Sequence, residues 1–215
     1  MIVLISAFLL LSAFSCGGGN KANSTSEQSE ETAVNVPQFD ADSAYLYVKN
    51  QVDFGPRVPN TKEHVACGNY LAGQLEAFGA QVTNQYADLI AYDGTLLKAR
   101  NIIGSYKPES KKRIALFAHW DTRPWADNDP DEKNHNTPIL GANDGASGVG
   151  ALLEIARLVN QQQPELGIDI ILLDAEDYGA PQFYTGQHKE EFWCLGSQYW
   201  ARNPHVQGYN ARFGI

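Results

Sequence analysis

Two kinds of hydrophobic pattern divide the chain into helices and strands. Apolar residues recur at the spacing of a buried helical face in three stretches, 40–52, 61–78 and 144–160. Short apolar runs typical of strands occupy 81–91, 96–106, 114–118 and 168–173. A short helix is expected at 198–202 and the start of a further strand at 211–215. Strands that alternate with helices predict an α/β fold, with a mixed, largely parallel sheet flanked by helices.

Local signals define two of these elements further. Asn60 and Glu63 have the spacing of a capping box, which predicts the start of the second helix. Its expected buried stripe consists of Val65, Leu71, Leu75 and Phe78. Asp93 and Gly94 lie between two strand-like runs, and this dipeptide predicts a hairpin.

The N-terminus has the character of an export signal. Residues 2–14 are nearly all apolar, but a bilayer span needs about 20 residues, so the run suits a signal peptide. The sequence around Cys16 resembles a bacterial lipobox, so we expect a lipoprotein signal peptide at 1–16, with an ordinary cleaved signal as the alternative. The polar stretch 17–38 has almost nothing to bury, and we expect it to be a flexible linker. We therefore expect an exported, periplasmic lipoprotein whose membrane contact is the lipid anchor at Cys16.

Length and charge limit the remaining possibilities. The 215 residues suffice for one domain, placed at 39–215, and the net charge is −9. Because the basic cluster at 111–113 stands alone, we expect no nucleic-acid partner. Cys67 and Cys194 could form a disulfide in an exported protein, and two separate buried thiols are the alternative.

Imidazole and carboxylate groups follow three elements that meet at one edge of the predicted sheet. His119 and Asp121 end the strand at 114–118, Asp144 precedes a helix, and Glu176 with Asp177 follows the strand at 168–173. Ligands gather beyond the carboxyl ends of strands in such sheets. This set of nitrogen and oxygen ligands suits zinc. Adjacent carboxylates point in opposite directions, so one of Glu176 and Asp177 can bind metal while the other moves protons.

These motifs resemble a known superfamily. HWD at 119–121, GANDGASG at 141–148 and AEDYG at 175–179 are similar to the zinc aminopeptidases and glutaminyl cyclases. Three longer segments resemble the bacterial, animal-like glutaminyl-peptide cyclotransferases: FGPRVPNT at 54–61, HWDTRPWAD at 119–127 and WCLGSQYW at 193–200. The resemblance runs from about residue 40 to the end of the sequence.

The resemblance implies roles for five residues. Asp144 and Asp177 would bind zinc, Glu176 would be the general acid and base, and Asp121 would orient the histidine at position 119. In the aminopeptidases that histidine binds a second zinc, whereas the cyclases hold one. Asp177 departs from the glutamate that is common at its position in the family.

The implied reaction is cyclisation of an N-terminal glutamine to pyroglutamate with release of ammonia, on peptide or protein substrates. Trp193 is the best candidate for the wall of the glutamine pocket, and Trp120 and Trp125 are weaker candidates. Trp200 is expected in the core. The alternatives are a zinc aminopeptidase of the same superfamily and an inactive binding lipoprotein.

Two residues that the resemblance requires have no counterpart. The family uses a further zinc-binding histidine far downstream and an aspartate soon after the strand at 211–215. We therefore expect the N-terminal part of a longer enzyme, C-terminally truncated, which binds zinc weakly and turns over little substrate. The other histidines are predicted to be surface residues: His64, His135, His188 and His205.

Overall fold

The computed structural model describes residues 35–215, of which Val36–Ile215 form one compact unit. The signal peptide, Cys16 and most of the linker at 17–38 lie outside the described residues, so those expectations stay predictions. Within residues 35–215, every helix is too short or too polar to cross a bilayer.

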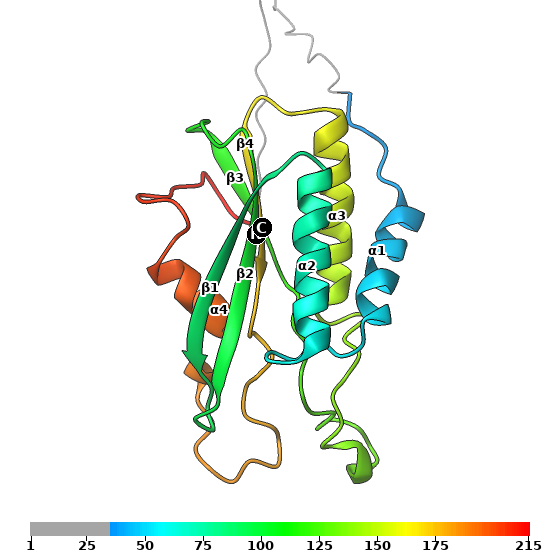
Figure 1. Ribbon diagram of the computed structural model, residues 1–215, viewed down its shortest axis with the longest axis vertical. Coiled ribbons are helices and arrows are strands. Elements are labelled where there is room, and N and C mark those ends of the chain that lie inside the picture. The colour runs from blue at the N-terminus through cyan, green and yellow to red at the C-terminus, as the bar shows by residue number, and fades with distance from the viewer. Residues whose placement is uncertain (1–34) are drawn as a thin grey trace, which may run out of the picture. The chain divides into compact units, whose positions relative to one another are not determined.

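Helices and strands alternate along the described chain (Figure 1). In chain order the elements are α1 Ala41–Asp53, α2 Lys62–Ala77, β1 Gln81–Ile90, β2 Leu96–Tyr106, β3 Arg113–His119, the 3-10 turn η1 Glu132–Asn134, α3 Ala146–Gln161, β4 Gly167–Leu173, the 3-10 turn η2 Glu190–Phe192 and α4 Leu195–Arg202. All predicted elements up to α4 are present, with shifts of a few residues at their ends.

The sheet has the strand order β1-β2-β4-β3. β1 and β4 each pair with β2 in antiparallel fashion, whereas β3 pairs with β4 in parallel. The end of the chain also runs parallel to β3, because the Phe117 amide donates to Ile215 at 2.8 Å and the Ile215 amide donates to Ala115 at 3.0 Å. The expected mixed α/β sheet is thus confirmed. Two of the three strand pairs in the described residues are antiparallel, so the expectation of a largely parallel sheet holds only for the half that carries β4 and β3.

Helices cover both faces of this sheet. Figure 1 shows α1, α2 and α3 on one face and α4 on the other. All seven residues of β4 are buried, as expected of a strand covered on both sides. Trp200 of α4 packs edge-on against Phe117 of β3, with ring centroids 5.4 Å apart, as its predicted core position requires. Because β3 and β4 are parallel, the loops that follow them leave the sheet at the same end.

The second helix is rotated relative to the predicted stripe. Leu71 and Leu75 are buried as expected, but Val65 is 56% exposed, and His64 and Cys67 face the core instead. The capping-box prediction was also wrong. Thr61 caps the helix by accepting the His64 amide at 3.2 Å.

Asn60 has a different task from the predicted cap. Its backbone φ is +75°, and its side chain bonds to β2: it accepts the Lys98 amide at 2.8 Å and donates to the Leu96 carbonyl at 2.9 Å. Asparagine tolerates this left-handed conformation better than most residues. Asn60 thus joins the α2 start to the sheet.

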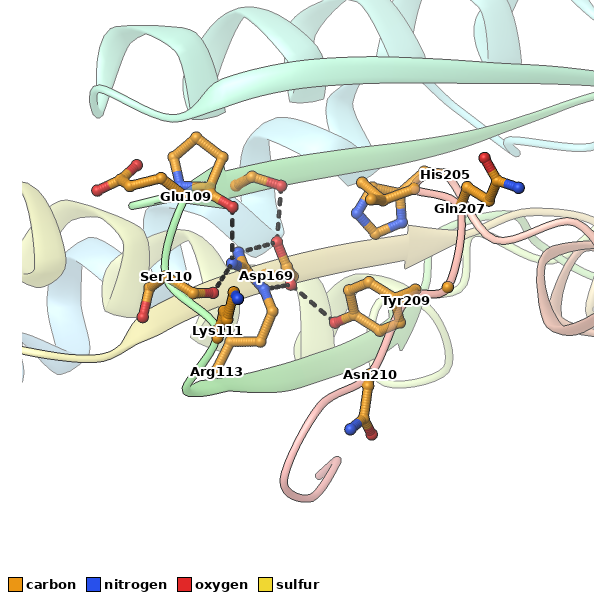
Figure 2. Close-up of a pocket in the computed structure, with 13 residues that line it drawn as sticks. Glu109, Ser110, Lys111, Arg113, Asp169, His205, Gln207, Tyr209 and Asn210 are labelled. Atoms are coloured by element: carbon orange, nitrogen blue, oxygen red, sulfur yellow. Dashed lines mark hydrogen bonds and ion pairs between the residues drawn. The ribbon is translucent and has the colours of Figure 1, made fainter.

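A buried ion pair joins β3 to β4 near their amino ends (Figure 2). Arg113 binds Asp169 through two bonds of 2.6 and 2.8 Å, and the hydroxyls of Ser105 and Tyr209 also donate to Asp169. The third guanidinium nitrogen donates to the carbonyls of Lys107, Pro108 and Ser110. Burial opposes ionisation of Asp169, but these donors outweigh it and lower the pKa of the carboxyl.

Helix α3 lies close to α1 because Gly150 has no side chain. A Cβ at this position would lie 2.6 Å from Cγ2 of Val48 and 2.9 Å from the carbonyl oxygen of Ala44. Gly73, in the middle of α2, has nothing within 4 Å of the same position. The two glycines therefore differ in packing but not in helical location.

We expect Gly150→Ala to destabilise the protein by about 1–3 kcal/mol, because the added methyl forces α1 and α3 apart. Gly73→Ala is the matched control and should stabilise by up to about 1 kcal/mol through helix propensity alone. Urea unfolding of both variants measures the difference. Equal or greater stability of Gly150→Ala would contradict this account of the packing.

Candidate metal centre

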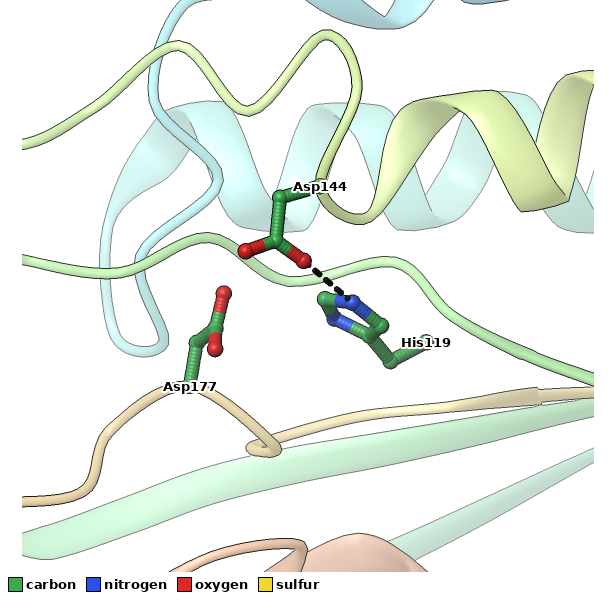
Figure 3. A group of neighbouring side chains, drawn as sticks. All are labelled: His119, Asp144 and Asp177. Carbon is green, nitrogen blue, oxygen red and sulfur yellow. Dashed lines mark hydrogen bonds and ion pairs between the residues drawn. The ribbon is translucent and has the colours of Figure 1, made fainter.

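Three side chains from separate elements converge beyond the carboxyl ends of β3 and β4 (Figure 3). His119 is the last residue of β3, Asp144 lies two residues before α3, and Asp177 lies in the loop after β4. One potential ligand atom of each lies within 4.8 Å of the other two. The sequence prediction of a shared edge is therefore confirmed for these three residues.

The group fits a zinc ion. Nε2 of His119 lies 3.0 Å from Oδ1 of Asp144. Oδ2 of Asp177 is buried and has no hydrogen-bond partner within residues 35–215. Buried polar atoms are ordinarily paired, so this oxygen points to a missing partner. One imidazole and two carboxylates are ligands that zinc accepts, and three protein ligands are typical of a catalytic zinc site.

Asp121 lies beneath this group and is fully buried. Its two carboxylate oxygens accept the backbone amides of Glu176 and Asp177, each at 3.0 Å. Oδ1 also lies 3.6 Å from Nδ1 of His119. The resemblance implied only that Asp121 orients the histidine. The structure adds that this carboxylate fixes the backbone of the Glu176–Asp177 pair.

Burial and mutual repulsion shift the acid–base properties of the site. Burial, followed by the negative charges of Asp121 and Asp144, raises the pKa of Asp177 to about 7. The same effects raise the pKa of Glu176. Burial opposes the charged form of His119, but the surrounding carboxylates outweigh it and raise its pKa to about 9. Several carboxylates thus surround one imidazole in this site, and their negative charge favours the binding of a cation.

His64, predicted at the surface, supports the loop that carries Glu176 and Asp177. It is 3% exposed, and its Nε2 lies 2.9 Å from both carboxylate oxygens of Asp174. Asp174 also accepts the Arg100 amide at 2.6 Å. The prediction for His64 was wrong because its helix turns the ring toward the sheet. Burial raises the pKa of the Asp174 carboxyl, while His64 opposes that shift.

The remaining histidines lie outside the group. His188 is exposed, as predicted, whereas His135 and His205 are half-buried. His205 accepts a hydrogen bond from the indole of Trp200 at 3.1 Å. The surface predictions for His135 and His205 therefore hold only in part.

The start of α4 is hydrogen-bonded to the loop that carries Glu176 and Asp177. The amides of Cys194, Leu195 and Gly196 donate to the carbonyls of Glu176, Ala175 and Asp174 at 3.0–3.1 Å. A Cβ on Gly196 would collide with the Asp174 carbonyl, which explains the glycine in the WCLG segment. Cys67 and Cys194 are free thiols, so the alternative of two separate thiols is the correct one.

The two tryptophans proposed for substrate binding differ in position. Trp120 is fully buried and stacks on His64, with ring centroids 4.3 Å apart. Its predicted contact with substrate was wrong, because successive residues at the end of β3 point to opposite sides. Trp193 is partly buried and lies against Gly179, with the guanidinium of Arg123 4.7 Å from its ring centre.

Sequence reasoning missed the buried arginines of the site. Arg57 is fully buried and donates to the carbonyls of Trp120 at 3.0 Å and of Leu140 and Gly141 at 2.7 Å. It thereby joins the end of β3 to the turn that leads to Asp144. The segment FGPRVPNT contained this residue, but only the fold brings its guanidinium beneath the site.

Comparisons with known proteins agree with this geometry. The chain is 94% identical to the glutaminyl cyclase of Bacteroides thetaiotaomicron, solved with N-acetylhistamine bound, over 84% of this chain and 62% of that one, with a TM-score of 0.84. It is 59% identical to the Tannerella forsythia glutaminyl cyclase, over 83% and 61% of the two chains, with a TM-score of 0.81. A Zn-dependent exopeptidase from Parabacteroides distasonis is 63% identical, over 84% and 61%, with a TM-score of 0.82.

The chain spans less than two thirds of each of these structures. The resemblance to the glutaminyl cyclases is confirmed, and the aminopeptidase-like fold is shared with the solved neighbours. The model of peptidase family M28 matches residues 101–215, which is more than half of the sequence and includes every member of the His–Asp–Asp group. The chain therefore belongs to peptidase family M28.

Proposed function

We propose that this chain carries the metal-binding and proton-transfer groups of a zinc-dependent glutaminyl cyclase. The observation that carries the proposal is the His119–Asp144–Asp177 group, with Glu176 next to Asp177 in the chain. It occurs in a chain 94% identical to a glutaminyl cyclase over 84% of its length. The reaction converts the N-terminal glutamine of a peptide or protein to pyroglutamate and releases ammonia.

His119, Asp144 and Asp177 would hold the zinc ion. When bound, zinc polarises the side-chain amide of the substrate and stabilises the oxyanion that forms on it. One ion is proposed for a cyclase and two for an aminopeptidase. The resemblance places His119 on a second zinc only in the aminopeptidases, and in the cyclases that histidine need not bind the single ion. Here one ligand atom of His119 lies within 4.8 Å of those of Asp144 and Asp177, which makes it available to the same ion.

Glu176 would transfer the proton. It is half-buried, and its backbone amide is fixed on Asp121 at 3.0 Å. The α-amine of the substrate attacks the side-chain amide carbon, a C–N bond forms to close the lactam, and the bond to the leaving nitrogen breaks. Glu176 accepts a proton from the amine and delivers it to that nitrogen, which leaves as ammonia. The raised pKa of Glu176 suits a group that must both accept and donate.

Trp193 is proposed as the wall of the glutamine pocket. Its partly exposed indole lies beside the loop of Glu176 and Asp177, because the ring packs against Gly179 and the next amide, of Cys194, donates to the Glu176 carbonyl at 3.1 Å. An aromatic face of this kind suits the methylene groups of a glutamine side chain.

Two other functions remain as alternatives. The similarity to an exopeptidase from Parabacteroides distasonis favours a zinc aminopeptidase as the second candidate. An inactive binding lipoprotein is the third. The cellular setting proposed for all three is the periplasm, with membrane contact through a lipid anchor at Cys16. Intact-mass analysis of the protein from membranes tests that anchor.

We expect Glu176→Gln to lower the rate of cyclisation by about 10²–10⁴-fold, because the amide cannot move the proton, while zinc binding is retained. Ammonia release and product mass should be followed with enzyme in excess over a Gln-peptide, so that slow turnover is measurable. Glu76→Gln, on the exposed face of α2, is the control. Release of free glutamine in place of pyroglutamate would overturn the cyclase in favour of the peptidase.

We expect the affinity for zinc to rise with pH between 6 and 9. Asp177, with a pKa of about 7, and His119, with a pKa of about 9, must each lose a proton to bind metal. Lower pH therefore favours the metal-free form. Zinc titration by calorimetry in two buffers of different ionisation enthalpy counts the released protons. A constant affinity across this range would rule out these two residues as ligands.

We propose that the 215-residue chain binds zinc weakly and turns over substrate more slowly than the Bacteroides thetaiotaomicron cyclase. The chain spans 62% of that protein, and the resemblance implies a further histidine ligand that no residue here matches. Zinc affinity and ammonia release of the two proteins should be measured side by side. Equal turnover would contradict the proposal and show that the described groups suffice.

A further inference from the structure

A second buried ion pair, formed by Arg123 and Asp127, lies beside the metal centre. Nε and Nη2 of Arg123 bind the two oxygens of Asp127 at 2.7 and 2.5 Å. The two residues are 8% and 5% exposed. Asp127 also accepts the amide of Gln182 at 2.8 Å. Burial opposes ionisation of Asp127, but these donors together lower the pKa of its carboxyl.

The guanidinium uses its remaining donors on the loop that carries Asp177. Nη1 donates to the carbonyl of Asp177 at 3.1 Å and lies 3.4 Å from that of Gly179, while Nη2 lies 3.4 Å from the carbonyl of Ala180. The central carbon of the guanidinium, Cζ, also lies over the ring of Trp193, 4.7 Å from the ring centre. One cation thus contacts the backbone of a proposed zinc ligand and the proposed wall of the substrate pocket.

We propose that Arg123, held by Asp127, is a positioning residue that fixes Asp177 and Trp193 relative to each other. The inference rests on the proposed metal site and adds a determinant of it outside the ligands and the acid–base group. The fork of the guanidinium reaches two carboxylate oxygens and the loop carbonyls at the same time, which a lysine ammonium cannot do. Residues that support metal ligands in this way commonly change metal affinity by 10–100-fold when they are replaced, a range we take as about the expected effect.

The sheet contains a matched control for this role. At its other end, Arg113 binds Asp169 at 2.6 and 2.8 Å and donates to three loop carbonyls, in the same arrangement. That pair (Figure 2) is also buried, but it lies toward the amino ends of β3 and β4, whereas the metal centre lies beyond their carboxyl ends. If replacing a buried arginine–carboxylate pair changes only the stability of the protein, replacing either pair should have the same effect on the metal centre.

The experiment compares two double variants, Arg123→Met/Asp127→Leu and Arg113→Met/Asp169→Leu. Replacing both partners by apolar residues avoids leaving a single buried charge. Two quantities are measured on the 215-residue chain: the zinc dissociation constant by competition with a chelator, and hydrogen exchange of the amides of Glu176 and Asp177. These amides donate to Asp121 and do not contact Arg123, so faster exchange reports movement of the loop.

In the Arg123 double variant we expect about 10–100-fold weaker zinc binding and about 10-fold faster exchange of both amides. In the Arg113 double variant we expect both quantities to stay within about twofold of the parent at equal fractions folded. Arg123→Lys, which keeps the charge and loses the fork, should resemble the first variant. If a double variant fails to fold, the comparison rests on Arg123→Lys and Arg113→Lys.

Unchanged exchange at Glu176 and Asp177 in the Arg123 variants would overturn the positioning role. Equal effects of the Arg123 and Arg113 variants would also overturn it, since the pair would then act through stability alone. A parent chain that binds no zinc at all would instead overturn the proposed metal site. The exchange data would still decide the role of Arg123.

Discussion

The arrangement of the site depends on one buried carboxylate at the end of β3. Asp121 accepts hydrogen bonds from two backbone amides of the loop after β4, and its Oδ1 lies 3.6 Å from Nδ1 of His119. β3 and β4 are parallel neighbours, so their last residues meet at one edge. The hydrogen bonds to Asp121 attach the backbone of Glu176 and Asp177 to the end of β3. Without its oxygens, the amides of Glu176 and Asp177 would be buried and unpaired, at a cost of about 1–3 kcal/mol each.

The sequence carried enough information for the fold and for most of the centre. The apolar run before His119 and the one before Asp174 defined two strands, and the polar residues after them defined the edge where ligands gather. Helix α3 was recognisable from its periodic apolar face. These features are local in the sequence, because hydrophobic spacing and strand ends do not depend on distant partners.

The features that the sequence did not predict depend on contacts between distant residues. Val65 and His64 are adjacent in α2, and which of them faces the sheet depends on Asp174, 110 positions away from His64. Trp120 and Trp193 are equally aromatic in the sequence, yet one stacks on His64 and the other lies at the surface of the site. The arginines are polar in any sequence-based pattern, so nothing local reveals that Arg57 is fully buried.

Each of the two loops that carry the carboxylates of the proposed metal site is bonded to its own arginine. Arg57 donates to the carbonyls of Leu140 and Gly141, before Asp144, and Arg123 donates to the carbonyl of Asp177. Neither arginine bonds to a ligand carboxylate in the described structure. A direct arginine pair would neutralise the carboxylate and compete with the metal for its oxygens. Because the guanidinium groups bind backbone carbonyls instead, the loops are held in place while the negative charge of Asp144 and Asp177 stays available to a metal ion.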